Sequence, residues 1–281
     1  YVKKKLMINV YEKNDLVPNP KADTDLFDAM VKLIFPHDDY REHFLNWYAY
    51  PVQYPGRKIR HALLLQSDEF QLGKGSLFDI HRDIIGHHNT NKIDLKEALD
   101  KSKGYLTNKQ TVLIDEAKAS GSWGEKNMFL NTLKTLITEG TAGVRQLYKD
   151  YVEQETITNY WINTNYRDAF PMPYNEVRYF VYFSEAKRNA ELLKEFHKER
   201  LYGDLNGGVL AQLMDRDLLS ASELFNWLSD NVRQVRVSRI RDVSASLRDV
   251  GGIEKKSCPV RDIGKFVTLW VIRNHDKYKN M

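Results

Sequence analysis

Four short apolar runs, separated by turns and helical patterns, constrain the fold of this chain more than any other feature. They lie at residues 62–65, 111–115, 159–163 and 178–183. Continuous apolar runs of about 4–8 residues are typical of strands that are buried on both faces. Because helical patterns alternate with these runs, the sequence predicts an α/β fold with a mostly parallel central sheet between layers of helices.

Helix-face spacing of apolar residues marks the elements between the runs. Leu26, Met30 and Ile34 follow one another at this spacing and predict a helix from residue 24, and a second helix from residue 39 should end before Pro51. Further helices are expected at residues 74–85 and 126–138, with a hairpin at 145–158. After residue 184 the chain should be mainly helical, with a break at 203–208 and a turn at 251–252.

Composition excludes several classes of protein. Charged residues make up 28% of the chain, and no apolar stretch approaches the ~18 residues of a membrane span. Cys258 is the single cysteine, which excludes an internal disulfide and cysteine-based zinc sites and fits an intracellular protein. The chain begins with Tyr1, so we expect a fragment of a longer polypeptide. Residues 231–281 hold 12 Lys or Arg against 5 Asp or Glu, as in a region that contacts an anionic partner or in a solvated helix face.

A candidate phosphate-binding loop follows the first apolar run. The polar residues 66–73 connect this run to the helix that begins at Lys74, which is the strand, loop and helix order of such a site. Asp68 stands where glycine is usual, and Gly75 separates Lys74 from Ser76. A glycine-rich turn with a solvated lysine is the alternative. The predicted nucleotide-binding residues are Gln71, Leu72, Gly73, Lys74, Gly75, Ser76 and Leu77.

Two adjacent carboxylates end the second run, 41 residues after Lys74. Asp115 at the strand tip could hold Mg²⁺ together with the Ser76 hydroxyl. Glu116 could orient and deprotonate an attacking water. A solvated strand end is the alternative for an isolated pair, but the pairing with a phosphate loop favours a nucleoside triphosphatase that uses ATP and Mg²⁺.

The third and fourth runs carry polar residues that suit the same chemistry. Asn163 and Asn165 end the third run, where an amide could contact the γ-phosphate and the water. Arg178 opens the fourth run and could act as an arginine finger. Taken alone, each residue is better explained as an ordinary turn asparagine or as part of a surface ion pair.

This order of motifs resembles the superfamily 3 helicases, in particular the helicase part of phage and viral primase–polymerases. The resemblance covers residues 24–215 and is tightest over 60–184. It implies an AAA+-like core and a ring, expected to be hexameric, that moves on single-stranded or forked DNA in viral replication in the host cytoplasm. It identifies Lys74 and Ser76 with the phosphate loop, and Asp115 with Glu116 as the acidic pair. Asn165 corresponds to the sensor, with Asn163 as a substitute.

The resemblance also assigns roles outside the phosphate loop. Arg178 would act on ATP held by a neighbouring subunit. A hairpin at residues 143–152 would grip DNA through Tyr148, Lys149 and Tyr151, although an exposed hairpin with a polar tip has the same pattern. A primase or polymerase domain is expected on the same polypeptide.

Three segments are predicted from these assignments. They are an N-terminal segment for assembly at 1–55, the ATPase core at 56–184 and a basic, mainly helical region at 185–281. Two other functions stay open. One is a small-molecule or nucleotide kinase, because adenylate-kinase-like loops also place glycine after the lysine. The other is a non-catalytic DNA-binding module, because the glycine at position 68 is missing.

Overall fold

The computed structural model describes most of the chain as far as residue 216. The described residues are 11–100, 102–115, 123–144, 152–167, 170 and 176–216, with two further strands at 253–255 and 269–271. No helix within these ranges has the length and apolar character needed to cross a bilayer.

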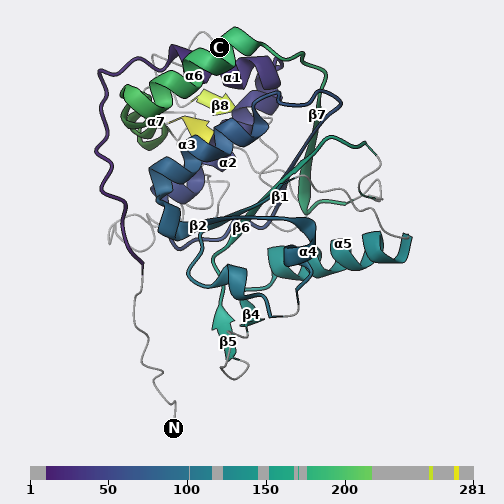
Figure 1. The fold of residues 1–281 in the computed structure, drawn as a ribbon. Coiled ribbons are helices and arrows are strands. Elements are labelled where there is room, and N and C mark those ends of the chain that lie inside the picture. Colours follow the sequence, from purple (N-terminus) through teal and green to yellow (C-terminus); the bar gives the residue numbers. More distant parts are fainter. Residues whose placement is uncertain are drawn as a thin grey trace.

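A five-stranded, fully parallel sheet forms the centre of the molecule (Figure 1). Four of its strands coincide with the four apolar runs, and the α/β class predicted from the sequence is confirmed. The order across the sheet is β2-β3-β6-β1-β7. The strands are β1 (Ala62–Ser67), β2 (Thr90–Ile93), β3 (Thr111–Ile114), β6 (Asn159–Thr164) and β7 (Tyr179–Ser184).

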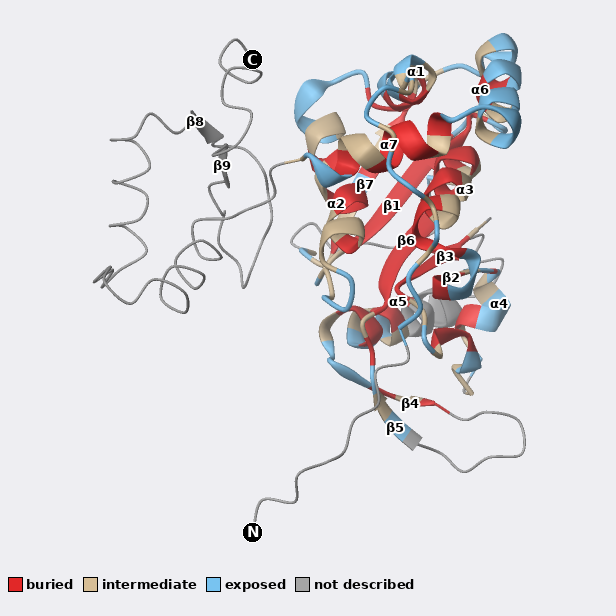
Figure 2. Cartoon of the chain, turned by 90° about the vertical axis from the view of Figure 1, so that its left-hand side faces the viewer, coloured by how far each residue is buried: buried red, intermediate tan, exposed pale blue. Residues whose placement is uncertain are grey.

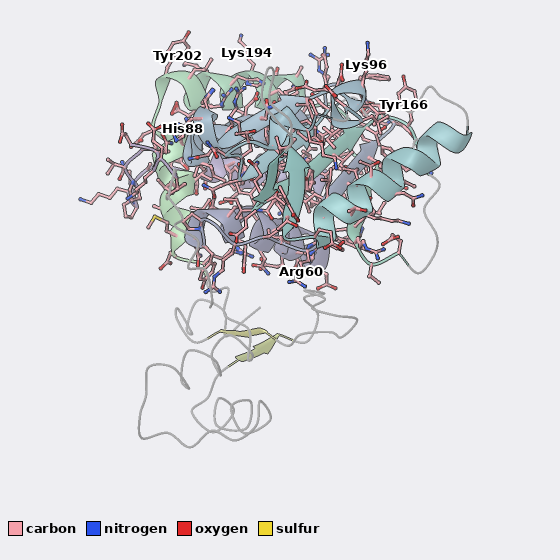
Figure 3. The ribbon with its side chains drawn as sticks, turned by 90° about the horizontal axis from the view of Figure 1, so that it is seen from below. Arg60, His88, Lys96, Tyr166, Lys194 and Tyr202 are labelled. Atoms are coloured by element: carbon pink, nitrogen blue, oxygen red, sulfur yellow. The ribbon has the colours of Figure 1, made fainter. Side chains whose placement is uncertain are left out.

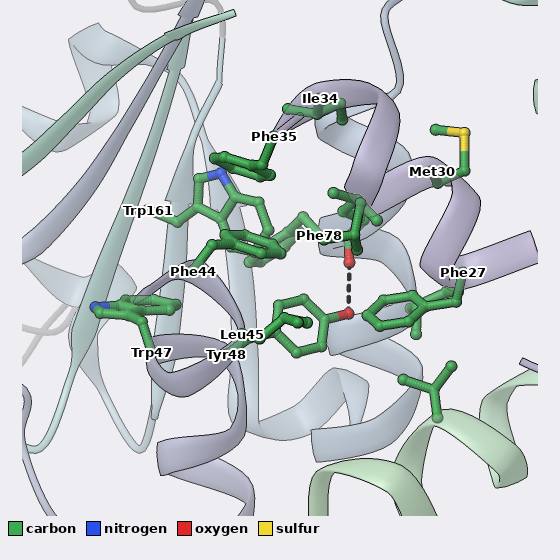
Figure 4. Close-up of a cluster of buried hydrophobic side chains, with 14 of the residues drawn as sticks. Phe27, Met30, Ile34, Phe35, Phe44, Leu45, Trp47, Tyr48, Phe78 and Trp161 are labelled. Atoms are coloured by element: carbon green, nitrogen blue, oxygen red, sulfur yellow. Dashed lines mark hydrogen bonds between the residues drawn. The ribbon is translucent and has the colours of Figure 1, made fainter. Parts of the chain in front are cut away.

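Five helices of the described residues cover one face of the sheet together. Leu63, Leu65 and Trp161 point into this layer, where Trp161 meets Phe44 and Phe78 edge to face (Figure 4). Elements that are distant in sequence therefore share one core. The helices are α1 (Asp25–Ile34), α2 (Asp38–Gln53), α3 (Lys74–Ile85), α6 (Ala190–Tyr202) and α7 (Leu205–Met214).

A second, smaller core lies on the opposite face. Leu64, Val112 and Ile162 alternate with the residues of the first core and pack against this side, and Figure 2 shows the strands buried between the two layers. The elements here are α4 (Leu95–Ala98), α5 (Trp123–Thr138) and the antiparallel strands β4 (Thr141–Val144) and β5 (Val152–Glu155). Short 3-10 turns lie at η1 (His87–Asn89) and η2 (Gly104–Leu106), and β8 (Ile253–Lys255) pairs with β9 (Leu269–Val271).

Several element boundaries differ from those predicted. Helix α2 continues through Pro51 to Gln53, because a proline in the last turn removes only one helical hydrogen bond while Pro51 itself is buried. Helix α7 begins inside the predicted break. Its Gly207 and Gly208 allow close approach of the N-terminal segment, whose Asn19 amide donates to the Gly207 carbonyl at 2.9 Å. The hairpin strand β4 ends at Val144, before the predicted start.

The edge strand β2 was not predicted from the sequence. The strand has only four residues, Thr-Asn-Lys-Ile, of which three are polar, and only Thr90 and Ile93 are buried. The strand pairs in parallel with β3, with Lys92 opposite Leu113. This register places a lysine beside the carboxyl end of the strand that leads to Asp115.

Candidate nucleotide-binding site

The loop between β1 and α3 turns sharply just before Lys74. Gln71 and Gly73 both have left-handed backbone conformations, with φ of 55° and 106°. The positive φ of Gly73 favours glycine at this position, and an added Cβ would also lie 2.2 Å from Cε at the end of the Met30 side chain. The turn directs the N-terminus of α3 into a cleft at the carboxyl ends of the strands, where backbone N–H groups favour an anion.

The two departures from the usual loop pattern leave this geometry intact. Asp68 is outside the left-handed region, and its exposed carboxylate pairs with Arg167 at 3.3 Å, so glycine is not needed there. Gly75 lies in the first turn of α3, and an added Cβ would meet no atom within 4 Å. Neither position therefore argues against an anion-binding loop.

The two glycines that flank Lys74 should respond to alanine in opposite ways. Gly73→Ala forces a side chain into the left-handed region and against Met30, and we expect a loss of about 1–2 kcal/mol in unfolding free energy. Gly75→Ala places a better helix former in open space and should stabilise α3 by roughly 0.5–1 kcal/mol. Chemical denaturation of both variants measures the difference, and equal effects would contradict the loop geometry.

Lys74 is buried at the start of α3 and donates three hydrogen bonds. Its Nζ lies 2.7 Å from Ser67 Oγ, 2.8 Å from the Thr164 carbonyl and 2.8 Å from Asn165 Oδ1. These contacts hold the ammonium between the ends of β1 and β6. Burial lowers the pKa of Lys74 to about 8, against the opposing effect of Asp115. The lysine is thus a desolvated cation that a phosphate group would stabilise.

Asp115 lies directly after β3, on the same edge of the sheet. Its Oδ2 pairs with Lys92 Nζ at 2.6 Å, and its Oδ1 accepts a long hydrogen bond from Asn163 Nδ2 at 3.5 Å. Asn163 is held in turn by Trp161 Nε1, which donates to its Oδ1 at 2.8 Å. The next residue, Glu116, lies outside the described residues.

The two candidate sensor asparagines therefore have different partners. Asn165 contacts the phosphate-loop lysine, and Asn163 contacts the acidic residue. Both line the cleft. Asn165 can therefore respond to the nucleotide through Lys74, and Asn163 through Asp115. The sequence alone could not separate these two roles.

The cleft has a volume of about 530 Å³ and is mainly cationic. Six of the seven predicted nucleotide-binding residues line it. Leu77 instead is buried in the core, where its carbonyl accepts a 2.7 Å hydrogen bond from Tyr48 (Figure 4). Sequence reasoning missed four basic lining residues, because they come from β2 and from α6 with the segment just before it. They are Lys92, Arg188, Lys194 and His197. Of these, Lys194 projects outward from α6 (Figure 3).

The protein oxygens of the cleft fit a magnesium ion that arrives with phosphate. Mg²⁺ is usually held by one or two protein groups, with waters and phosphate oxygens completing the shell. The Asp115 carboxylate and the Ser76 hydroxyl both face the cleft, and Ser76 Oγ lies 3.1 Å from His197 Nε2. Within the described ranges, no three His, Cys, Asp or Glu side chains form a metal cluster of their own. These residues therefore suit an ion that the nucleotide helps to hold.

The predicted arginine finger lies far from this cleft. Arg178 precedes β7, and Tyr179 pairs with Ala62 at the start of β1, whereas Lys74 follows the end of β1. The guanidinium pairs with Glu176 at 3.0 Å, and Glu176 also pairs with Lys134 of α5. The predicted DNA contacts Tyr148, Lys149 and Tyr151 lie outside the described residues, between β4 and β5.

Comparison with known proteins finds one matching family model and several solved structures with a similar fold. Residues 65–178 match the model of a family of unknown function, DUF5906. The chain shares its fold with the NrS-1 C-terminal region. Its apo structure (305–718) aligns at a TM-score of 0.61 and 19% identity, covering 90% of this chain and 70% of that chain. The A form of the same region aligns at a TM-score of 0.61 and 18% identity, again covering 90% of this chain and 70% of that chain. The JCV helicase aligns at a TM-score of 0.44 and 13% sequence identity, covering 86% of this chain and 68% of that chain. No curated protein matches the sequence.

Proposed function

We propose that this chain is the ATP-hydrolysing motor of a replicative DNA helicase. The observation that carries the proposal is the convergence of Lys74, Asp115 and Asn165 in one cationic cleft at the carboxyl ends of β1, β3 and β6. Ligands of open α/β sheets bind at this edge. A mainly cationic cleft next to a helix N-terminus suits a nucleoside triphosphate.

The residues of the cleft have different roles in the proposed hydrolysis. Lys74 and the N-terminal amides of α3 hold the phosphates and stabilise the charge that develops on them. Asn165 and Asn163 fix the positions of Lys74 and Asp115. Glu116 is the proposed acceptor of the proton from the attacking water. Mg²⁺, when bound, supplies further positive charge at the phosphate oxygens.

The DNA-directed part of the proposal is supported by the resemblance to superfamily 3 helicases and by the β4-β5 hairpin. The hairpin projects from the sheet face opposite α3 (Figure 1). In the proposed assembly, a ring that we take to be a hexamer brings these hairpins to single-stranded or forked DNA. A primase or polymerase domain on the same polypeptide would complete the replication protein.

DNA-stimulated ATP turnover tests this function. We expect ATP hydrolysis in the presence of Mg²⁺ to rise when single-stranded DNA is added, together with a DNA- and ATP-dependent increase in mass in solution. Transfer of the γ-phosphate to a nucleoside monophosphate, without release of inorganic phosphate, would instead identify a kinase. Absence of any turnover, with DNA binding intact, would leave only a non-catalytic module.

A further inference from the structure

Lys92 lies in the nucleotide cleft although it comes from β2, the edge strand three positions from β1. Its Nζ is 2.6 Å from Asp115 Oδ2, and its side chain is 45% exposed against 25% for that of Asp115. The pair thus lies at the open side of the cleft. Ion pairs with this exposure contribute little to stability, so folding alone gives little reason for a lysine here.

The carboxylate that Lys92 holds is the proposed metal ligand. An ammonium 2.6 Å from Asp115 Oδ2 occupies the space in which Mg²⁺, with bonds of about 2.0–2.1 Å, would bind the same oxygen. An ion that binds this oxygen directly would compete with Lys92 for it. The backbone of Lys92 stays fixed beside Leu113 by the β2-β3 register, so the released ammonium remains in the cleft.

The phosphate chain offers the displaced ammonium its nearest new partner. Lys74 lies at β1 and β6, whereas Asp115 and Lys92 lie at β3 and β2, further along the same edge. A triphosphate that starts at the N-terminus of α3 and extends past Lys74 toward Asp115 would present its last phosphate to Lys92. A diphosphate lacks the phosphate that this path would bring to Lys92.

We propose that Lys92 is a second phosphate-binding lysine, which leaves Asp115 when the metal binds and pairs with the terminal phosphate of a triphosphate. The proposal rests on the nucleotide site proposed above and adds a residue that distinguishes triphosphate from diphosphate. In the ligand-free protein the same lysine pairs with Asp115, which neutralises its charge and holds its carboxylate in position.

Equilibrium binding to the full chain tests this role without relying on turnover. Lys92→Met removes the charge and keeps the length of the side chain. With Mg²⁺ present, we expect it to weaken a fluorescent, non-hydrolysable ATP analogue about tenfold, and the matching ADP analogue by less than about twofold. Mn²⁺ titration of the nucleotide-free protein, followed by electron paramagnetic resonance, should show tighter binding in Lys92→Met because the competing ammonium is gone. Lys92→Arg should retain the preference for triphosphate.

Lys96→Met is the matched control, because Lys96 is exposed on α4 and does not line the cleft (Figure 3). It should bind both analogues as the unmodified chain does. Equal weakening of both analogues by Lys92→Met, or tighter binding of the triphosphate, would overturn the proposal. If the unmodified chain and Lys74→Ala bind the analogues equally, the nucleotide site itself is wrong. Binding that depends on Lys74 but not on Lys92 would remove only the role of Lys92.

Discussion

Lys74→Ala should lower ATP turnover by about a hundredfold or more, the loss that follows removal of one preorganised charge-stabilising group. The substitution deletes the cation that lies between Ser67, Thr164 and Asn165, and leaves the α3 amides in place. Because charge builds on the phosphates during the reaction, the effect on turnover should exceed the effect on nucleotide binding. Steady-state hydrolysis and analogue binding, measured on the same preparation, separate the two.

A surface control and a pH series sharpen this test. Lys32→Ala removes an exposed lysine on α1, outside the cleft, and should leave turnover unchanged. The pKa of Lys74 is about 8 in the free protein because the side chain is buried. A bound triphosphate favours its charged form, so affinity should fall as the pH rises above about 8. Retained turnover in Lys74→Ala would remove the motor interpretation.

The sequence predicted the parts of the site whose signals are local. Strand β1, the loop and helix α3 lie within 24 consecutive residues, and the apolar run before Lys74 indicated their order. Asp115 was found in the same way, because an apolar strand ends beside it. The alternation of Leu63, Leu64 and Leu65 between the two cores explains why this strand shows no polar face.

The remaining cleft residues could not be predicted because tertiary packing brings them there. Lys92 belongs to a short polar strand that the register with β3 creates. His197 lies on α6, 121 residues after Ser76, and reaches it because α6 packs over the start of α3. The side-chain environment of Lys74 and its lowered pKa follow from the same packing. For Asn163 and Asn165, the sequence identified the segment and the fold assigned a different partner to each.

Arg178→Ala should reduce turnover about a thousandfold if the residue is an arginine finger. Its place in the fold limits how it could act. Arg178 precedes the start of β7, which pairs with the start of β1, whereas the phosphate loop follows the end of β1. Six strand residues separate the two, roughly 17–20 Å at the usual rise per residue. Arg178 therefore cannot reach the cleft of its own chain, and any contribution must come from a neighbouring subunit.

Mixing two inactive variants tests whether the contribution crosses a subunit boundary. An Arg178→Ala subunit keeps its own cleft, and a Lys74→Ala subunit can supply the missing arginine, so mixtures should regain turnover. Mixing Arg178→Ala with the double variant Lys74→Ala/Arg178→Ala supplies no arginine and should stay inactive. Glu176→Gln weakens the same local ion pair without removing Arg178 and should retain most activity. Equal losses in Glu176→Gln and Arg178→Ala, with no recovery in any mixture, would assign Arg178 to the packing of β7 against α5.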